Sequence, residues 1–180
     1  MKRGLLLLVV GVLAPMFQGA LVVHLPRMLV PDLSLLVVMA LALCWRSTGG
    51  GLLMAALVGF VADLLSSSLL GQHGLLLLAT FAAARTASGH VNLKGGLAQA
   101  VFAVAWTTIY GLGLGGLTAF FSPGVPFAWV DAGELVLRAL INGIAAPLVC
   151  GAVAAMVSRL GEDESGGRRT LRLEARKISL

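Results

Sequence analysis

The chain has few charged residues and few aromatic ones. Only 12% of its 180 residues are charged and 6% are aromatic, whereas 58% are hydrophobic and the mean hydropathy is +0.96. Soluble domains carry roughly 25% charged residues, so this composition indicates an integral membrane protein. The formal net charge of +5 comes from basic residues scattered between apolar runs. We attribute that charge to membrane topology and expect no nucleic-acid binding.

The motifs of common enzyme classes are also missing. The sequence contains no Gly-x-Ser-x-Gly, no His-Glu-x-x-His, no phosphate-binding glycine loop and no Cys-x-x-Cys. Its histidines, His24, His73 and His90, are too far apart to form one metal site. We therefore expect no catalytic residue, no metal and no cofactor. Cys44 and Cys150 both fall in apolar runs, where we expect them to be buried small hydrophobic residues.

Six apolar segments alternate with short polar turns, over residues 4–23, 33–45, 51–65, 75–87, 97–121 and 135–159. Each predicts a transmembrane helix, although the second is short for a hydrocarbon core of about 30 Å. The first resembles a signal peptide in its charged start but lacks a small-x-small cleavage site, so we expect it to be retained. The fold class expected is an all-α integral membrane protein, a bundle of six transmembrane helices over residues 1–160.

Residues 161–180 differ from the rest of the chain in composition. An acidic, glycine-rich stretch precedes a basic end, which predicts a flexible linker and a basic cytoplasmic tail. The tail could lie on anionic membrane lipids, add a strand to a cytoplasmic partner, or be disordered with weak lipid attraction, the interpretation that we favour.

The distribution of lysine and arginine predicts the orientation. With the N-terminus inside, Arg27 alone falls on the outer side, and the inner side receives Lys2, Arg3, Arg46, Arg85, Lys94 and Arg159. Cytoplasmic loops carry an excess of basic residues, so we expect a multi-pass protein with both termini in the cytoplasm.

Asp63 lies inside an otherwise apolar run. A charged side chain at the bilayer centre costs roughly 2.5–3.5 kcal/mol, so one that is retained usually faces a partner or a cavity. Gly59 lies one helical turn earlier on the same face, where it would let another helix approach closely, and Gly71 closes the segment. We interpret these three residues as helix-packing or partner contacts. The alternative is that Asp63 only bonds to nearby serines or interfacial water.

Three further residues are candidates for helix packing or partner contact. Arg138 is expected near the outer end of the sixth segment, at a depth similar to that of Asp63, so we hypothesise that the two charges pair. The alternative is that Arg138 extends to the outer surface alone. Gly111 and Gly115 belong to a glycine-rich part of the fifth segment. Glycine at this density favours close helix packing over a kink.

The pattern Gly59-x-x-x-Asp63-Leu64, continuing to Leu70-Gly71, resembles the rod shape-determining membrane protein MreD family. The resemblance extends to further positions that cover most of residues 1–160, namely Pro31-Asp32, Arg46, Asn142, Pro147 and Arg159. Residues 161–180 have no counterpart in it.

This resemblance implies a non-catalytic membrane scaffold subunit of the bacterial cell-wall elongation complex, located in the cytoplasmic (inner) membrane and supporting rod shape and lateral peptidoglycan synthesis. The implied partners are MreC and, indirectly, MreB filaments, the glycosyltransferase RodA and its class B transpeptidase. The family fold is similar to the substrate-binding subunits of energy-coupling factor transporters. A vitamin-binding subunit of such a transporter is therefore the alternative function.

Overall fold

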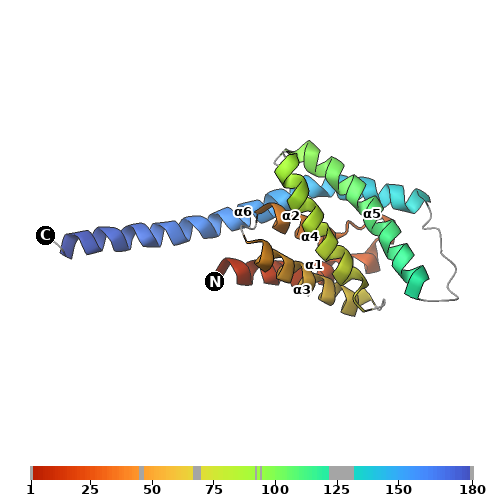
Figure 1. The fold of residues 1–180 in the computed structure, drawn as a ribbon, viewed down its shortest axis with the longest axis horizontal. Coiled ribbons are helices and arrows are strands. Elements are labelled where there is room, and N and C mark those ends of the chain that lie inside the picture. The colour runs from red at the N-terminus through yellow and green to blue at the C-terminus, as the bar shows by residue number, and fades with distance from the viewer. Residues whose placement is uncertain are drawn as a thin grey trace.

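The protein is all-helical over the residues that the computed structural model describes, which are 2–44, 47–66, 70–91, 93, 95–121 and 132–178. Six α-helices and one 3₁₀ turn follow one another: α1 Lys2–His24, η1 Arg27–Leu29, α2 Leu33–Cys44, α3 Thr48–Ser66, α4 Gln72–His90, α5 Gly96–Phe121 and α6 Ala132–Ile178 (Figure 1). The all-α fold and each of the six expected helical segments are thereby confirmed. The basic residues Arg46 and Lys94, which were counted on the inner side, lie outside the described residues.

The short helix α2 forms the centre of the bundle. Its sequence, LSLLVVMALALC, is apolar on all sides, and the nine residues from Ser34 to Ala42 are all buried. A helix that is hydrophobic all round needs cover on every face, and α2 obtains it from α1, α3, α4 and α6. At 1.5 Å per residue its 12 residues measure about 18 Å, less than the hydrocarbon core of a bilayer.

Side chains from three other helices hold the two ends of α2. At the N-terminus, Asp32 Oδ1 accepts the Leu35 N–H at 3.2 Å and Gln18 Oε1 of α1 accepts the Leu33 N–H at 3.0 Å. The Asp32 N–H donates to Asn142 Oδ1 of α6 at 2.7 Å. Helix ends carry unpaired backbone groups, which must find partners away from water.

At the C-terminus of α2, Arg85 Nη1 of α4 donates to the Ala42 carbonyl oxygen at 3.1 Å. The side chain thus satisfies one of the terminal carbonyl groups and places a cation where the helix dipole is negative. Because both ends of α2 are bonded in this way, the central helix is fixed along its own axis.

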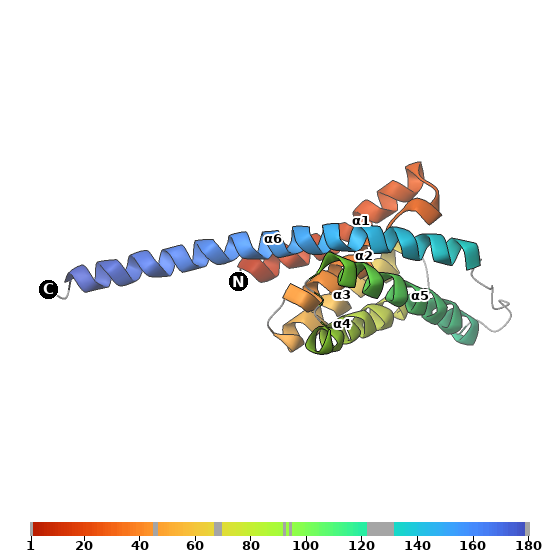
Figure 2. The same cartoon turned by 90° about the horizontal axis from the view of Figure 1, so that it is seen from above.

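The remaining helices pack around α2 as two antiparallel hairpins, α3–α4 and α5–α6, with α1 against α2 and α3. The N-terminus lies at the end of the bundle from which α6 projects (Figure 1). Figure 2 shows the same projection from above. Helix α6 continues without a break to Ile178. The backbone of residues 161–178 is therefore helical, and a boundary at residue 160 with a flexible tail beyond it stays a prediction.

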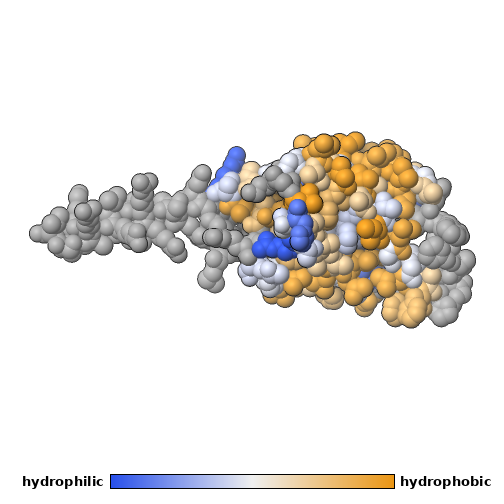
Figure 3. Space-filling view, turned by 45° about the horizontal axis from the view of Figure 1, so that its top comes forward, coloured by the Kyte–Doolittle hydropathy of each residue, from blue (hydrophilic) through white to orange (hydrophobic). Residues whose placement is uncertain are grey.

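The surface of the bundle is largely apolar. Large side chains such as Leu97, Phe120, Val23 and Ile144 are more than 70% exposed. Figure 3 shows hydrophobic residues over most of the visible face and hydrophilic residues near the end from which α6 projects. Apolar surface of this extent requires a lipid or protein cover.

Three helical stretches within the described residues are long and apolar enough to cross a membrane: Thr48–Ser66, Gly96–Phe121 and Ala132–Arg159. The apolar stretches Leu8–His24 and Leu33–Cys44 are shorter. The six helices are thus present, whereas six full spans are not established. The burial and length of α2 explain why its apolar sequence does not suffice for a span.

Candidate functional site: the Asp63 cap and the buried polar network

Asp63 is buried inside the bundle and bonds to the start of α4. Only 1% of the residue is exposed. Its Oδ1 accepts the backbone N–H of His73 at 2.8 Å, and its Oδ2 accepts those of Gly71 at 2.9 Å and Gly74 at 3.1 Å. The carboxylate therefore accepts hydrogen bonds from three backbone N–H groups at once.

These donors belong to the first turn of α4, where N–H groups have no helical partner. Gly71 is the N-cap residue, and its own position offers no side-chain cap. Its φ of +98° lies in the left-handed region, which suits glycine. Asp63, projecting from the last turn of α3, thus replaces a local cap, and its carboxylate faces the positive end of the α4 dipole.

Gly59 brings the first turn of α4 within reach of Asp63. A Cβ at position 59 would lie 2.5 Å from Gly74 Cα and 2.9 Å from Gly74 N. These are backbone atoms, so no rotamer change could relieve the overlap. Gly59 and Asp63 therefore act on the same turn of the next helix, and the Gly-x-x-x-Asp spacing is a single packing unit.

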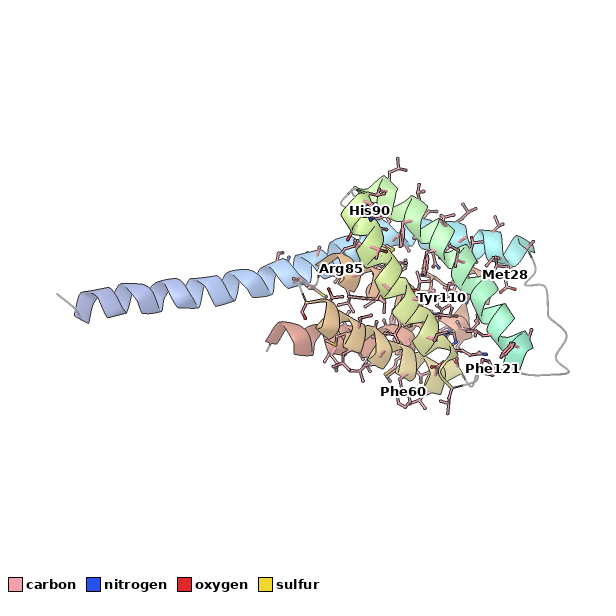
Figure 4. All side chains as sticks on the ribbon, in the orientation of Figure 1. Met28, Phe60, Arg85, His90, Tyr110 and Phe121 are labelled. Carbon is pink, nitrogen blue, oxygen red and sulfur yellow. The ribbon has the colours of Figure 1, made fainter. Side chains whose placement is uncertain are left out.

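A second polar contact joins α4 to α5. His73 Nδ1 lies 2.6 Å from the hydroxyl oxygen of Tyr110. In Figure 4 the Tyr110 side chain lies between α5 and α4. Tyr110 is itself buried. His73, whose backbone N–H donates to Asp63, is thus also tied to α5 through its side chain.

Asn142 links three helices at the centre of the bundle. It is fully buried. Its Oδ1 accepts the Asp32 N–H before α2, and its Nδ2 donates to Thr107 Oγ1 of α5 at 3.0 Å. Polar side chains at this depth are costly unless bonded, so Asn142 fixes the relative positions of α2, α5 and α6. We define the buried polar network as two separate hydrogen-bonded sets, Asp63–His73–Tyr110 and Asp32–Asn142–Thr107. Asp32 and His73 are half-buried, and the other four residues are buried.

Arg138 lies one helical turn before Asn142 and does not pair with Asp63. No ion pair joins the two among the described residues, so the pairing hypothesis is wrong in this structure. The Asp63 oxygens instead accept hydrogen bonds from three backbone N–H groups. Arg138 is half-buried, and its Nε is buried with no hydrogen-bond partner in the described part of the chain.

The glycines of α5 contribute unequally. A Cβ at Gly111 would lie 2.6 Å from Leu135 Cδ1 of α6, so Gly111 sits at a close approach of these two helices. Gly115 is half-buried in the same helix. Helix α5 continues without a break through both of these glycines. A partner role for Gly59, Asp63, Gly71, Arg138, Gly111 or Gly115 remains a prediction.

Sequence reasoning missed several residues of the buried polar network. Asn142, Tyr110 and Thr107 were not site candidates, although each is a polar residue within an apolar run. For Asn142, which stands alone, that position is the same signal that singled out Asp63, whereas Thr107 and Tyr110 lie close to Thr108 in the sequence. Within the described residues no three His, Cys, Asp or Glu side chains gather as a metal site, and both cysteines are free thiols.

Comparison with known families identifies the chain. The sequence model of the family described as rod shape-determining protein MreD matches residues 3–153, from α1 into α6. The chain belongs to the MreD family. No curated protein and no solved structure shows a match. The expected similarity of this MreD-family chain to energy-coupling factor transporter subunits therefore has no support.

The matched residues include Gly59, Asp63 and the whole buried polar network, whereas the projecting part of α6 lies beyond the match. The membership supports a role in rod shape determination, and the family is one of shape-determining proteins, not of known enzymes. Candidate spans of membrane length in this MreD-family chain are consistent with a membrane protein.

Proposed function

We propose that the chain is a non-catalytic membrane scaffold of the bacterial cell-wall elongation complex, which binds MreC and, through it, MreB, RodA and its class B transpeptidase. The observation that carries this proposal is the family membership. The structure supports it in a specific way: Asp63 and Asn142 bond within the chain, and the outside of the bundle presents mainly apolar side chains. Such a surface suits the transmembrane helices of other subunits.

The test is recovery of partners from native membranes. The tagged full chain is solubilised in a gentle detergent, pulled down and characterised by mass spectrometry, with an unrelated tagged polytopic protein as the control. Enrichment of MreC, RodA or the transpeptidase over the control supports the scaffold. Enrichment of none of them, from cells in which all are expressed, contradicts it.

We also propose that all six helices insert from the cytoplasmic side with both termini in the cytoplasm. The N-terminus and the projecting end of α6 lie at the same end of the bundle, as this topology requires (Figure 1). Alkaline phosphatase fusions test it. A fusion after residue 26 should be active and one after residue 178 inactive, and the opposite pattern rejects the topology.

A further inference from the structure

A pocket of about 450 Å³ lies between the start of α4 and the end of α5. Its rim is apolar and open to the surface of the bundle, because Leu70, Leu75 and Phe121 are each more than half exposed. Figure 4 shows Phe121 at the end of α5. We call this space the α4–α5 pocket, and its lining residues are Leu70, Gly71, Gln72, Leu75, Leu117 and Phe121.

Gln72 contributes a polar side chain to this otherwise apolar lining. It is the first residue of α4, and only 6% of it is exposed. Its Nε2 donates to Thr118 Oγ1 of α5 at 3.4 Å, and the Thr118 hydroxyl in turn donates to the Leu114 carbonyl oxygen at 2.8 Å. Because that hydroxyl has a single hydrogen, it must accept from Gln72, which fixes the end of the amide that faces Thr118.

The Gln72 amide has hydrogen-bonding capacity left over. An amide carries two N–H donors and an acceptor oxygen, and the bond to Thr118 uses one donor. No described residue donates to Gln72 Oε1. This oxygen is not sealed inside the bundle either, since Arg138 Nε is the side-chain atom that is buried without a partner in the described part of the chain. Gln72 is nearly buried and lines the pocket, so its oxygen is available to an occupant of the pocket.

The pocket lies at the level where two apolar helices end. Helix α5 is long and apolar enough to cross a membrane and ends at Phe121, and α4 begins at Gln72. At the boundary of the hydrocarbon core, a lipid molecule changes from apolar chains to a polar head. None of the lining residues is charged, so recognition depends on apolar contact and hydrogen bonding.

The volume of the pocket distinguishes a lipid from a partner helix. One turn of an α-helix, about 10 Å across and about 5.4 Å high, occupies about 420 Å³. The pocket is hardly larger than this, so it cannot receive a transmembrane helix. A flexible acyl chain can fill it, and its volume falls within the range of ligand pockets, about 300–1,000 Å³.

We propose that the α4–α5 pocket binds one membrane lipid, whose acyl chain contacts the apolar lining and whose head group donates a hydrogen bond to Gln72 Oε1. Under the topology proposed above, this lipid comes from the outer leaflet. The inference goes beyond the scaffold function and does not depend on it, because lipid binding is measured without any partner protein.

Competition between two lipids tests the hydrogen bond. The full chain in detergent is exposed to an equimolar mixture of phosphatidylethanolamine and phosphatidylcholine with identical chains, and its lipid adducts are measured by native mass spectrometry. Both lipids are zwitterionic, but only the ethanolamine head has N–H donors. We expect the ethanolamine adduct to exceed the choline adduct about 3- to 20-fold, the range of a hydrogen bond between membrane helices. Equal adducts, or none, overturn the proposal.

A variant that lacks the acceptor locates the preference. Gln72→Leu removes the oxygen, so the ethanolamine and choline adducts should become equal. Gln99→Leu is the matched control, because Gln99 lies near the other end of α5 and donates to the Leu93 carbonyl oxygen. Q99L should keep the preference of the unmodified chain. A preference that survives in Q72L shows that the head group binds elsewhere and overturns the proposal.

A pocket-filling variant gives a second readout that leaves the Gln72–Thr118 bond in place. Leu75→Trp fills the pocket from an exposed position, and Leu53→Trp adds the same side chain to an exposed position of α3 outside the pocket. We expect L75W to lose the preference for the ethanolamine lipid and L53W to retain it, with both variants monodisperse in detergent. An undiminished preference in L75W contradicts binding in the α4–α5 pocket.

Discussion

The Asp63 carboxylate accepts a hydrogen bond of 3.1 Å from the backbone N–H of Gly74, the residue whose Cα lies 2.5 Å from where a Cβ at position 59 would stand. Close packing and capping therefore depend on each other at the α3–α4 hairpin. An intramembrane aspartate in this chain stabilises its own fold, and its loss would affect partners through the shape of the bundle.

Gly59→Ala should destabilise the bundle. The added methyl group overlaps backbone atoms of α4, and overpacking of this kind costs about 1–3 kcal/mol. Thermal unfolding in detergent measures the effect. Gly151→Ala is the matched control, because nothing lies within 4 Å of a Cβ at that position of α6. An equal melting temperature for the two variants would show that the helices are not in close contact at Gly59.

Asp63→Asn should free the first turn of α4. An amide offers one acceptor oxygen, whereas three backbone N–H groups bond to the carboxylate, and hydrogen bonds to a charged group contribute about 1.5–3 kcal/mol each. Hydrogen exchange of a peptide covering residues 71–75 should accelerate. The control is Glu134→Gln, which makes the same chemical change in the first turn of α6. It should not alter the exchange of the peptide covering residues 71–75.

Exchanging the charges of Asp63 and Arg138 should not restore stability. An arginine at position 63 offers only donors, and the groups that it would face are the backbone donors of Gly71, His73 and Gly74. The double variant Asp63→Arg/Arg138→Asp should be no more stable than Asp63→Arg alone. A melting temperature that returns toward that of the unmodified chain would revive the ion pair.

Asn142→Ala and Thr107→Val should be coupled. Their side chains share a hydrogen bond of 3.0 Å, and double-mutant cycles between membrane helices average about 0.6 kcal/mol. Thr118→Val is the control partner, because Thr118 accepts from Gln72 and lies three turns further along α5. The cycle with Thr118 should be additive. Additivity in both cycles would mean that the Asn142–Thr107 bond contributes nothing.

The sequence predicted the helices well because their ends are marked locally by glycine, proline and polar residues. It singled out Asp63, whose backbone donors are 8, 10 and 11 residues away, and Gly59, which packs against Gly74. The sequence does not predict which groups they contact, because every residue except proline has a backbone N–H and its position in space depends on the fold. Asp32 and Asn142 are 110 positions apart, and nothing local relates them. The burial of α2 was equally hidden, because a helix surrounded by protein and one surrounded by lipid share the same uniform apolarity.

The hydrogen bonds at the N-terminus of α2 cannot all form at the same stage of biosynthesis. Asp32 leaves the ribosome long before Asn142, the acceptor for its N–H, has been translated. Until α6 has been inserted, the Asp32 N–H lacks the acceptor that it has in the complete bundle. Unpaired backbone groups are disfavoured in a lipid environment. The N-terminal end of α2 therefore obtains its full set of hydrogen bonds only after α6 has been synthesised. A ribosome stalled before codon 142 would hold a bundle in which this end of α2 still lacks its hydrogen bond to α6.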